Sequence, residues 1–289
     1  MEPSFEALFQ GAARLGMMAA TRGLSWQRFT PFVESFSPEL EGYQELSLTP
    51  AGRDLGLMTR GSGQGYTHRV ARYMDLRGVP EARLRRMLVT AKYFEHRNLF
   101  FKVELTPDGE EMSWYFRRRP RLSVALDWLA ADGVGETDRG ITALVASTLG
   151  KKTVHFMGCS ESPSASGSKI YFSQPAGAPW EDLLAVSGIV GLSEDAWAPL
   201  LAQRDELEGE TCFLSLDYAG GRLQQGLKID VHGAPTDAVD ALAGVRASPH
   251  GLTLLKLFER PRYDYIGVRL RPEQAPTVKV YCYRQGALK

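Results

Sequence analysis

The sequence predicts an α+β fold in which pairs of antiparallel strands alternate with helices. The first observation is a recurring pair of segments in which polar and apolar residues alternate, as they do in half-buried strands. The second is the even spacing of these pairs, which start near residues 41, 98, 152, 210 and 263. The third is that segments with helical spacing or good helix formers lie between the pairs. Together they predict five hairpins separated by helices.

Each element has its own sequence signal. The two partners of a pair are separated by residues that favour turns, chiefly proline and glycine. These turns are Pro50-Ala51-Gly52, Pro107-Asp108-Gly109, 163–167, Gly220-Gly221 and 272–276. A helix is expected to open the chain at 3–20, where Leu8, Ala12, Leu15 and Ala19 form one apolar stripe. Further helices are expected at 80–94, 121–131, 180–189 and 236–245.

The pattern is compatible with two arrangements of the ten strands. An open sheet has two unpaired edges, and closure into a barrel removes both. In a barrel of this pattern the apolar strand faces would point outward to a ring of helices, and the polar faces would point into a lumen. An open α+β sheet layered with helices uses the same pattern. No low-complexity linker divides the chain, so we expect one domain over residues 1–289.

Composition excludes several classes of protein. The 34 basic and 34 acidic residues give no net charge, which argues against a nucleic-acid partner. No apolar run approaches the roughly 18 to 20 residues that span a bilayer, so no membrane partner is expected. The N-terminus lacks the order of a signal peptide, so a cytoplasmic location is expected. The three cysteines are far apart and form neither a disulfide framework nor a zinc motif.

The second strand of each pair places a cation on its polar face. Because residues i and i+2 of a strand share a face, Lys169 lies beside Tyr171 and Lys279 lies beside Tyr281. The five cations are Arg60, Arg117, Lys169, Lys228 and Lys279. A solvated sheet face is one interpretation. The recurrence in all five pairs and the interleaved tyrosines favour a lumen that binds a polyanion. Lysine and arginine would hold a diphosphate leaving group, and tyrosine faces would shield an allylic carbocation.

Four local sequences resemble the ABBA, or PT-barrel, prenyltransferases, both the bacterial branch acting on small aromatics and the cyanobactin-type peptide branch. They are Lys-Ile-Tyr-Phe-Ser at 169–173, the start of the ninth strand at 263–267, Lys-Val-Tyr-Cys-Tyr at 279–283, and the stretch 215–223. None is a strict signature, and the resemblance rests on their order and spacing along essentially the whole chain. It implies a ten-stranded antiparallel β-barrel with a solvent-filled lumen, surrounded by helices in repeating ααββ units.

The resemblance also implies an activity in secondary metabolism or peptide modification. The protein would move a dimethylallyl or geranyl group from its diphosphate to an electron-rich acceptor, either an aromatic small molecule or a side chain of a modified peptide. Arg60 matches an arginine of the peptide branch, and Arg117 is alternatively a solvated strand end. The residues expected to bind the prenyl diphosphate are Arg60, Arg117, Lys169, Tyr171, Lys228, Lys279, Tyr281 and Tyr283.

Glu45 is the candidate catalytic residue. It lies on the first strand, on the face opposite Leu46, and the peptide branch uses a first-strand glutamate to take the proton of the acceptor. An ordinary polar strand residue is the alternative. Some small-aromatic members bind magnesium through an aspartate on the second strand, where this chain offers only Asp54 at the start. We therefore expect no protein-bound metal, although Mg²⁺ can accompany the diphosphate. A monomer is expected.

Two other functions use the same cations. A non-catalytic barrel could bind a phosphorylated or acidic small molecule, and a prenyltransferase-like protein could have lost or changed its donor. Glu45 favours the enzyme, because an inward carboxylate would weaken the binding of an anion. A phenol, an indole and a peptide side chain all remain open as the acceptor.

Overall fold

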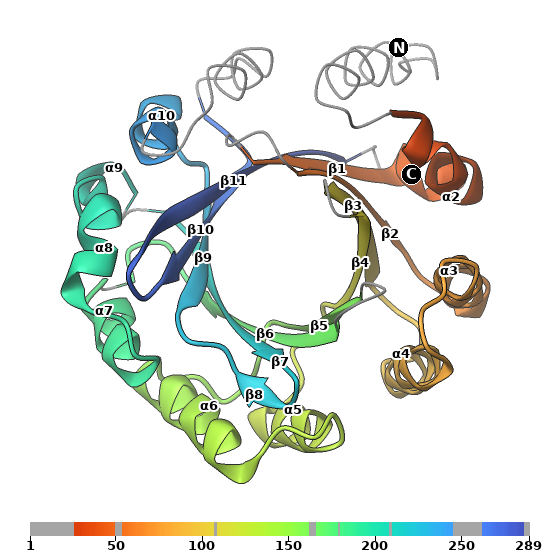
Figure 1. The fold of residues 1–289 in the computed structure, drawn as a ribbon, viewed down its shortest axis with the longest axis horizontal. Helices are drawn as coiled ribbons and strands as arrows, with labels where there is room; N and C mark the ends of the chain where they lie inside the picture. Colours follow the sequence, from red (N-terminus) through yellow and green to blue (C-terminus); the bar gives the residue numbers. More distant parts are fainter. Residues whose placement is uncertain are drawn as a thin grey trace.

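The computed structural model describes residues 26–49, 54–106, 109–161, 166–178, 180–207, 210–244 and 262–285. The helix expected at 3–20 lies outside these residues. In the described part, ten strands close into one antiparallel barrel (Figure 1). Each strand pairs with its neighbours in the chain, β1 pairs with β11, and β6 pairs with β7. The prediction of a closed barrel is therefore confirmed, and the alternative of an open sheet is excluded.

The strands follow the predicted hairpins closely. A two-residue strand, β8 (Arg222–Leu223), pairs only with β7 and extends the fourth hairpin. The barrel strands are β1 (Tyr43–Leu48), β2 (Leu55–Gly61), β3 (Leu99–Thr106), β4 (Gly109–Phe116), β5 (Phe156–Glu161), β6 (Ser166–Gln174), β7 (Cys212–Ala219), β9 (Leu227–His232), β10 (Tyr265–Arg271) and β11 (Gln274–Gln285).

Helices surround the barrel on its outer side (Figure 1). Pairs of helices precede β3 and β5, which gives the ααββ unit that the resemblance implied. The helices are η1 (Trp26–Phe29), α2 (Thr30–Gly42), α3 (Gln64–Asp75), α4 (Glu81–Tyr93), α5 (Leu122–Ala130), α6 (Glu136–Thr148), α7 (Trp180–Ile189), α8 (Glu194–Leu201), α9 (Arg204–Leu207) and α10 (Thr236–Gly244). The predictions at 80–94, 121–131, 180–189 and 236–245 are confirmed by α4, α5, α7 and α10. None of the described helices is long and apolar enough to cross a bilayer.

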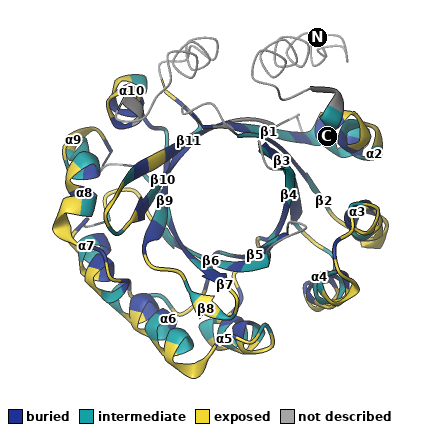
Figure 2. Ribbon diagram, viewed as in Figure 1, coloured by how far each residue is buried: buried dark blue, intermediate teal, exposed yellow. Residues whose placement is uncertain are grey.

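The hydrophobic core lies between the barrel and the helices, not inside the barrel. Outward strand residues are buried beneath the inner faces of the helices, whose outer faces are exposed (Figure 2). Phe32 and Phe36 of α2, for example, pack against Phe101 of β3, with ring centroids 5.8 and 5.4 Å apart. Because most aliphatic residues are used in this way, the inward faces are left for polar and aromatic residues.

Replacing Trp114 of β4 tests whether this layer is the hydrophobic core. Its side chain is fully buried, and its ring lies 5.8 Å from the ring of Phe116 and 6.2 Å from that of Trp128 on α5. Trp114→Ala should lower the free energy of unfolding by about 3–5 kcal/mol, the usual cost of truncating a large buried aromatic residue. Urea unfolding measures this. Leu144→Ala, at a position 54% exposed on α6, is the control and should change stability by about 0.5 kcal/mol or less. Equal effects would contradict a core in this layer.

Candidate active site

The lumen of the barrel is a cavity of about 720 Å³, lined by residues from all ten barrel strands. The residues expected to bind a substrate meet there, although they come from five different strands and from the residue that follows β4. Glu45, Arg60, Arg117, Lys169, Tyr171, Lys228, Lys279 and Tyr281 all line it. The side chain of Tyr283 lies outside the described part of the structure.

The strand register sorts the inward side chains into levels along the barrel axis. Hydrogen-bonded rungs run at right angles to the strands, and barrel strands tilt, so each rung climbs along the axis. The rung that passes Glu45 on β1, for example, reaches Gly167 on β6. Lys228 shares a rung with Tyr171, two residues from Lys169, and with Thr277, two residues from Lys279. These offsets match the climb of the rungs, so the three lysines lie at one level of the lumen.

The two ends of the lumen carry different cations. We call the end toward which β1 runs the lysine end, and it holds the three lysines of the level just described. We call the end at which β1 begins the arginine end. There Arg60 is the second-last residue of β2 and Arg117 directly follows β4. Glu45 lies between the two ends, nearer to the arginines.

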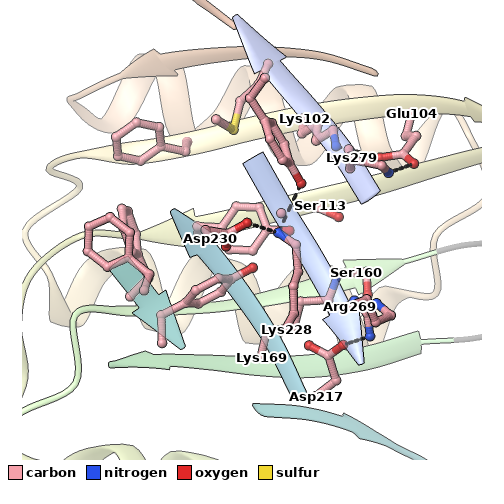
Figure 3. A pocket seen from close by; sticks show the side chains of 18 of the residues that line it. Lys102, Glu104, Ser113, Ser160, Lys169, Asp217, Lys228, Asp230, Arg269 and Lys279 are labelled. Atoms are coloured by element: carbon pink, nitrogen blue, oxygen red, sulfur yellow. Dashed lines mark hydrogen bonds and ion pairs between the residues drawn. The ribbon is translucent and has the colours of Figure 1, made fainter. Parts of the chain in front are cut away.

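Most cations at the lysine end are already paired with carboxylates (Figure 3). Lys102 Nζ lies 2.5 Å from Glu104 Oε2, and Lys279 pairs with the other oxygen of the same carboxylate. Burial would raise the pKa of Glu104, but the two lysines hold it well below its usual range. Lys228 and Asp230 form a further pair, 2.5 Å apart, and Arg269 pairs with Asp217. These pairs fix the cations in place before any ligand enters.

Lys169 differs from these neighbours. Its ammonium group forms neither a hydrogen bond nor an ion pair with any of the described residues. Burial alone would lower the pKa of Lys169, but the nearby Tyr115, Asp217 and Glu111 raise it above its ordinary value. Lys169 therefore stays protonated and keeps its donors available to an anion in the lumen (Figure 3).

Aromatic side chains form a collar between the lysine end and the arginine end. Tyr115 meets Tyr171 edge to face at 5.8 Å, and Tyr265 stacks on Tyr281 at 4.2 Å. Lys228 donates a hydrogen bond of 3.0 Å to the Tyr281 hydroxyl. We define this aromatic collar as Phe100, Tyr115, Phe156, Tyr171, Phe213, Tyr265 and Tyr281. Ring faces that surround a space attract a cation placed within it.

Glu45 sits in this collar and is only 2% exposed. The hydroxyl groups of Tyr43 and Tyr265 both donate to Glu45 Oε2, at 3.0 and 2.5 Å. Burial raises the pKa of Glu45 to about 7, although the Tyr265 hydrogen bond and the charge of Lys102 oppose the shift. A carboxylate with this pKa can accept a proton near neutral pH.

No family model matches the sequence, and no curated protein sequence is significantly similar to it. Solved structures, however, share the fold. The prenyltransferase PriB, in complex with L-tryptophan and dimethylallyl thiolodiphosphate (DMSPP), is 14% identical with a TM-score of 0.59, over 85% of this chain and 80% of PriB. NotF with brevianamide F and DMSPP is 12% identical with a TM-score of 0.61, over 86% and 81%. The 5-dimethylallyl tryptophan synthase of Streptomyces coelicolor, with DMASPP and Trp, is 14% identical with a TM-score of 0.58, over 94% and 93%.

The fold is the PT barrel. At this identity the similarity concerns the fold alone.

Apart from Glu45, sequence reasoning missed the lumen residues that the first strands of the pairs supply to this PT barrel. Lys102 and Glu104 alternate with Val103 on β3, and the same signal would have found them there. Asp217 and Arg269 could not have been paired from the sequence, because they lie on strands far apart in the chain. The missed residues are Lys102, Glu104, Asp217, Tyr265 and Arg269.

Two glycines make room for the lumen cations. A Cβ at Gly56 would lie 2.4 Å from Lys102 Cε, and one at Gly267 would lie 2.5 Å from Lys228 Cε. Both lysine side chains therefore cross the space that a larger residue would fill.

Asp54 does line the lumen, where it accepts a hydrogen bond of 3.2 Å from Thr49 and where burial raises its pKa. Within the described ranges, no three His, Cys, Asp or Glu residues come together as metal ligands. That the protein binds no metal of its own stays a prediction.

Proposed function

We propose that residues 1–289 form one PT-barrel domain, a cytoplasmic monomer that transfers a prenyl group from its diphosphate to an electron-rich aromatic acceptor. The order of groups along the lumen carries the proposal. Cations at the lysine end, the aromatic collar and the buried carboxylate of Glu45 follow one another in the order that the reaction needs. The DMSPP complexes of PriB and NotF, which share the fold, support a prenyl diphosphate as the donor.

The diphosphate of the donor would bind at the lysine end. When the bond between the allylic carbon and oxygen breaks, the electron pair leaves with the diphosphate, and fixed cations stabilise that growing negative charge. Lys169 offers its free ammonium group, while Lys228 and Lys279 contribute from the same level. Mg²⁺ can arrive with the diphosphate. The allylic cation would then lie in the aromatic collar, where Tyr171 and Tyr281 face it, with Tyr283 proposed beside them.

The acceptor would meet the allylic cation at the level of Glu45. The aromatic ring, or its heteroatom, supplies the electron pair of the new bond to the allylic carbon, and the acceptor then loses one proton. Glu45 takes that proton on a carboxylate oxygen, which gives a product with the same charge as the acceptor. The hydrogen bonds from Tyr43 and Tyr265 fix the orientation of the carboxylate before the acceptor binds.

The pH dependence of transfer should follow the ionisation of Glu45. A base must be deprotonated, so kcat/KM for the acceptor should fall about tenfold per pH unit below a pKa of about 7. On the alkaline side, burial lowers the pKa of Lys279, so this lysine loses its proton at a lower pH than an ordinary lysine does. Turnover of the donor should therefore fall before the pH reaches the ordinary pKa of lysine. A profile of kcat/KM from pH 5.5 to 10 measures both limbs. A flat acid limb would contradict Glu45 as the base.

The proposed function is tested by supplying both substrates. The protein is incubated with dimethylallyl or geranyl diphosphate and a panel of phenols, indoles and aromatic peptides, and the products are read by mass. An acceptor that gains one prenyl group in place of a hydrogen supports the proposal. Binding of the diphosphates without transfer to any acceptor would favour the non-catalytic barrel instead.

A further inference from the structure

A second pocket opens at the arginine end of the barrel. It has a volume of about 310 Å³ and is lined by Arg60, Asn98, Phe100, Arg117, Arg118 and Arg119. Arg60, Phe100 and Arg117 also line the lumen, so the two cavities adjoin each other. We call this space the rim pocket. Among its described lining residues four are arginines and none is acidic.

The positive charge of the rim pocket is uncompensated. In the described part of the chain, none of its four arginines forms an ion pair with a carboxylate. The Arg60 guanidinium lies over the rings of Tyr43 and Phe100, at 5.2 and 5.7 Å, and that of Arg117 lies 5.8 Å from the ring of Phe156. Burial, together with the charges of Arg119 and Arg60, lowers the pKa of Arg117. The lysine end is different, because there carboxylates neutralise most of the cations.

The donor diphosphate does not account for these arginines. Arg60 and Lys279 are separated along the barrel axis by about four residue positions, which corresponds to on the order of 10 Å in tilted strands. The aromatic collar lies between the two levels. A diphosphate held by Lys169 would therefore not reach Arg60 or Arg117, which we had expected to bind the donor.

We infer that the rim pocket binds a carboxylate of the acceptor, so that the acceptor is an aromatic acid. This inference rests on the proposed function. The aromatic ring would occupy the collar beside Glu45, and the carboxylate would extend one level further to Arg60 and Arg117. Guanidinium groups bind carboxylates with two parallel hydrogen bonds, which fixes orientation as well as charge. A free aromatic acid and the C-terminal carboxylate of a peptide offer the same chemistry.

Matched acids and amides test the inference by calorimetry, without any turnover. The probes are 3-phenylpropanoate, indole-3-propanoate and their primary amides. The wild-type protein should bind an acid at least about tenfold more tightly than its amide, equivalent to roughly 1.4 kcal/mol. Arg60→Met and Arg117→Met should each remove most of this preference. Arg97→Met is the control, because Arg97 lies at the same end, pairs with Glu95 and does not line the rim pocket. It should keep the preference.

A second arm separates the two sources of the carboxylate. Acetyl-Gly-Trp with a free C-terminus is compared with the same peptide amidated at its C-terminus. Preference for the free peptide over indole-3-propanoate would identify a peptide terminus, and the reverse would identify a small aromatic acid. Either result supports a carboxylate site.

The outcomes also distinguish this inference from the proposed function. Equal affinity for acids and amides, or no binding of any acid, overturns the inference, while diphosphate release by the wild-type protein leaves the proposed function intact. An acid preference carried by Arg60 and Arg117 supports the inference even if no donor reacts. If the arginine variants instead lose affinity for dimethylallyl thiolodiphosphate and keep the acid preference, the arginines belong to the donor site and the inference is wrong.

Discussion

Replacing Lys169 with Ala should lower the turnover of a prenyl diphosphate about 100-fold. Among the described lumen lysines it is the one without a carboxylate partner, so it offers its full charge to the leaving group. A 100-fold loss corresponds to about 2.7 kcal/mol of transition-state stabilisation. Lys279→Ala should cost less, about tenfold, because Lys279 shares Glu104 with Lys102. Release of inorganic diphosphate under saturating acceptor measures both effects.

Lys92→Ala provides the control for Lys169→Ala. Lys92 is exposed on α4, outside the barrel, so this variant removes the same charge without touching the lumen. It should keep wild-type turnover. The unfolding midpoint of Lys169→Ala should also stay close to that of the wild type, since the side chain makes no ion pair within the described part. Wild-type turnover in Lys169→Ala would mean that the diphosphate binds elsewhere.

Replacing Glu45 with Gln should lower acceptor prenylation by about 100-fold or more, the usual range for removing a general base. Gln keeps the size of the side chain and can still accept hydrogen bonds from Tyr43 and Tyr265. Donor affinity should not fall, because the lost charge is negative. Hydrolysis of the donor by water should persist, since ionisation depends on the lysine end.

Three measurements on this variant separate the roles: donor affinity, donor hydrolysis and acceptor transfer. Glu41→Gln, which removes an exposed carboxylate just before β1, is the control and should leave all three unchanged. Unchanged transfer in Glu45→Gln would remove Glu45 from the mechanism. Parallel loss of all three, with an altered circular dichroism spectrum, would indicate damage to the fold.

The hairpins and four of the ten described helices could be predicted, because they have local signals. Strand alternation and turn residues placed each hairpin, and α7 matches its predicted bounds. Helix α3 was missed, although Tyr66, Val70, Tyr73 and Met74 form a buried stripe with helical spacing. Its start follows a glycine-rich stretch that is typical of a loop, and Gly63 at its N-cap adopts a φ of 92°. Barrel closure had no local signal, since the pairing of β1 with β11 joins the two ends of the chain.

The candidate site, like the fold, could be predicted only in part from the sequence. The inward position of Lys169 or Tyr281 follows from alternation along one strand, so the sequence alone indicates which side chains share a face. Alternation does not indicate which of the cations lacks a carboxylate partner. That depends on contacts such as the one between Arg269 and Asp217, which lie 52 residues apart. The pKa of Glu45 depends on burial and on Tyr265, 220 residues away, which only the closed barrel brings together.

The most direct test of prenyl transfer is to measure diphosphate release and acceptor mass in the same reaction. Dimethylallyl diphosphate is supplied to the wild-type protein with and without an aromatic acid, and the Lys169→Ala and Glu45→Gln variants are run in parallel. We expect one diphosphate released for each acceptor that gains a prenyl group, with Lys169→Ala impaired in release and Glu45→Gln impaired in transfer. Tight binding of the donor, with neither release nor product across the panel, would contradict the account and identify an anion-binding barrel.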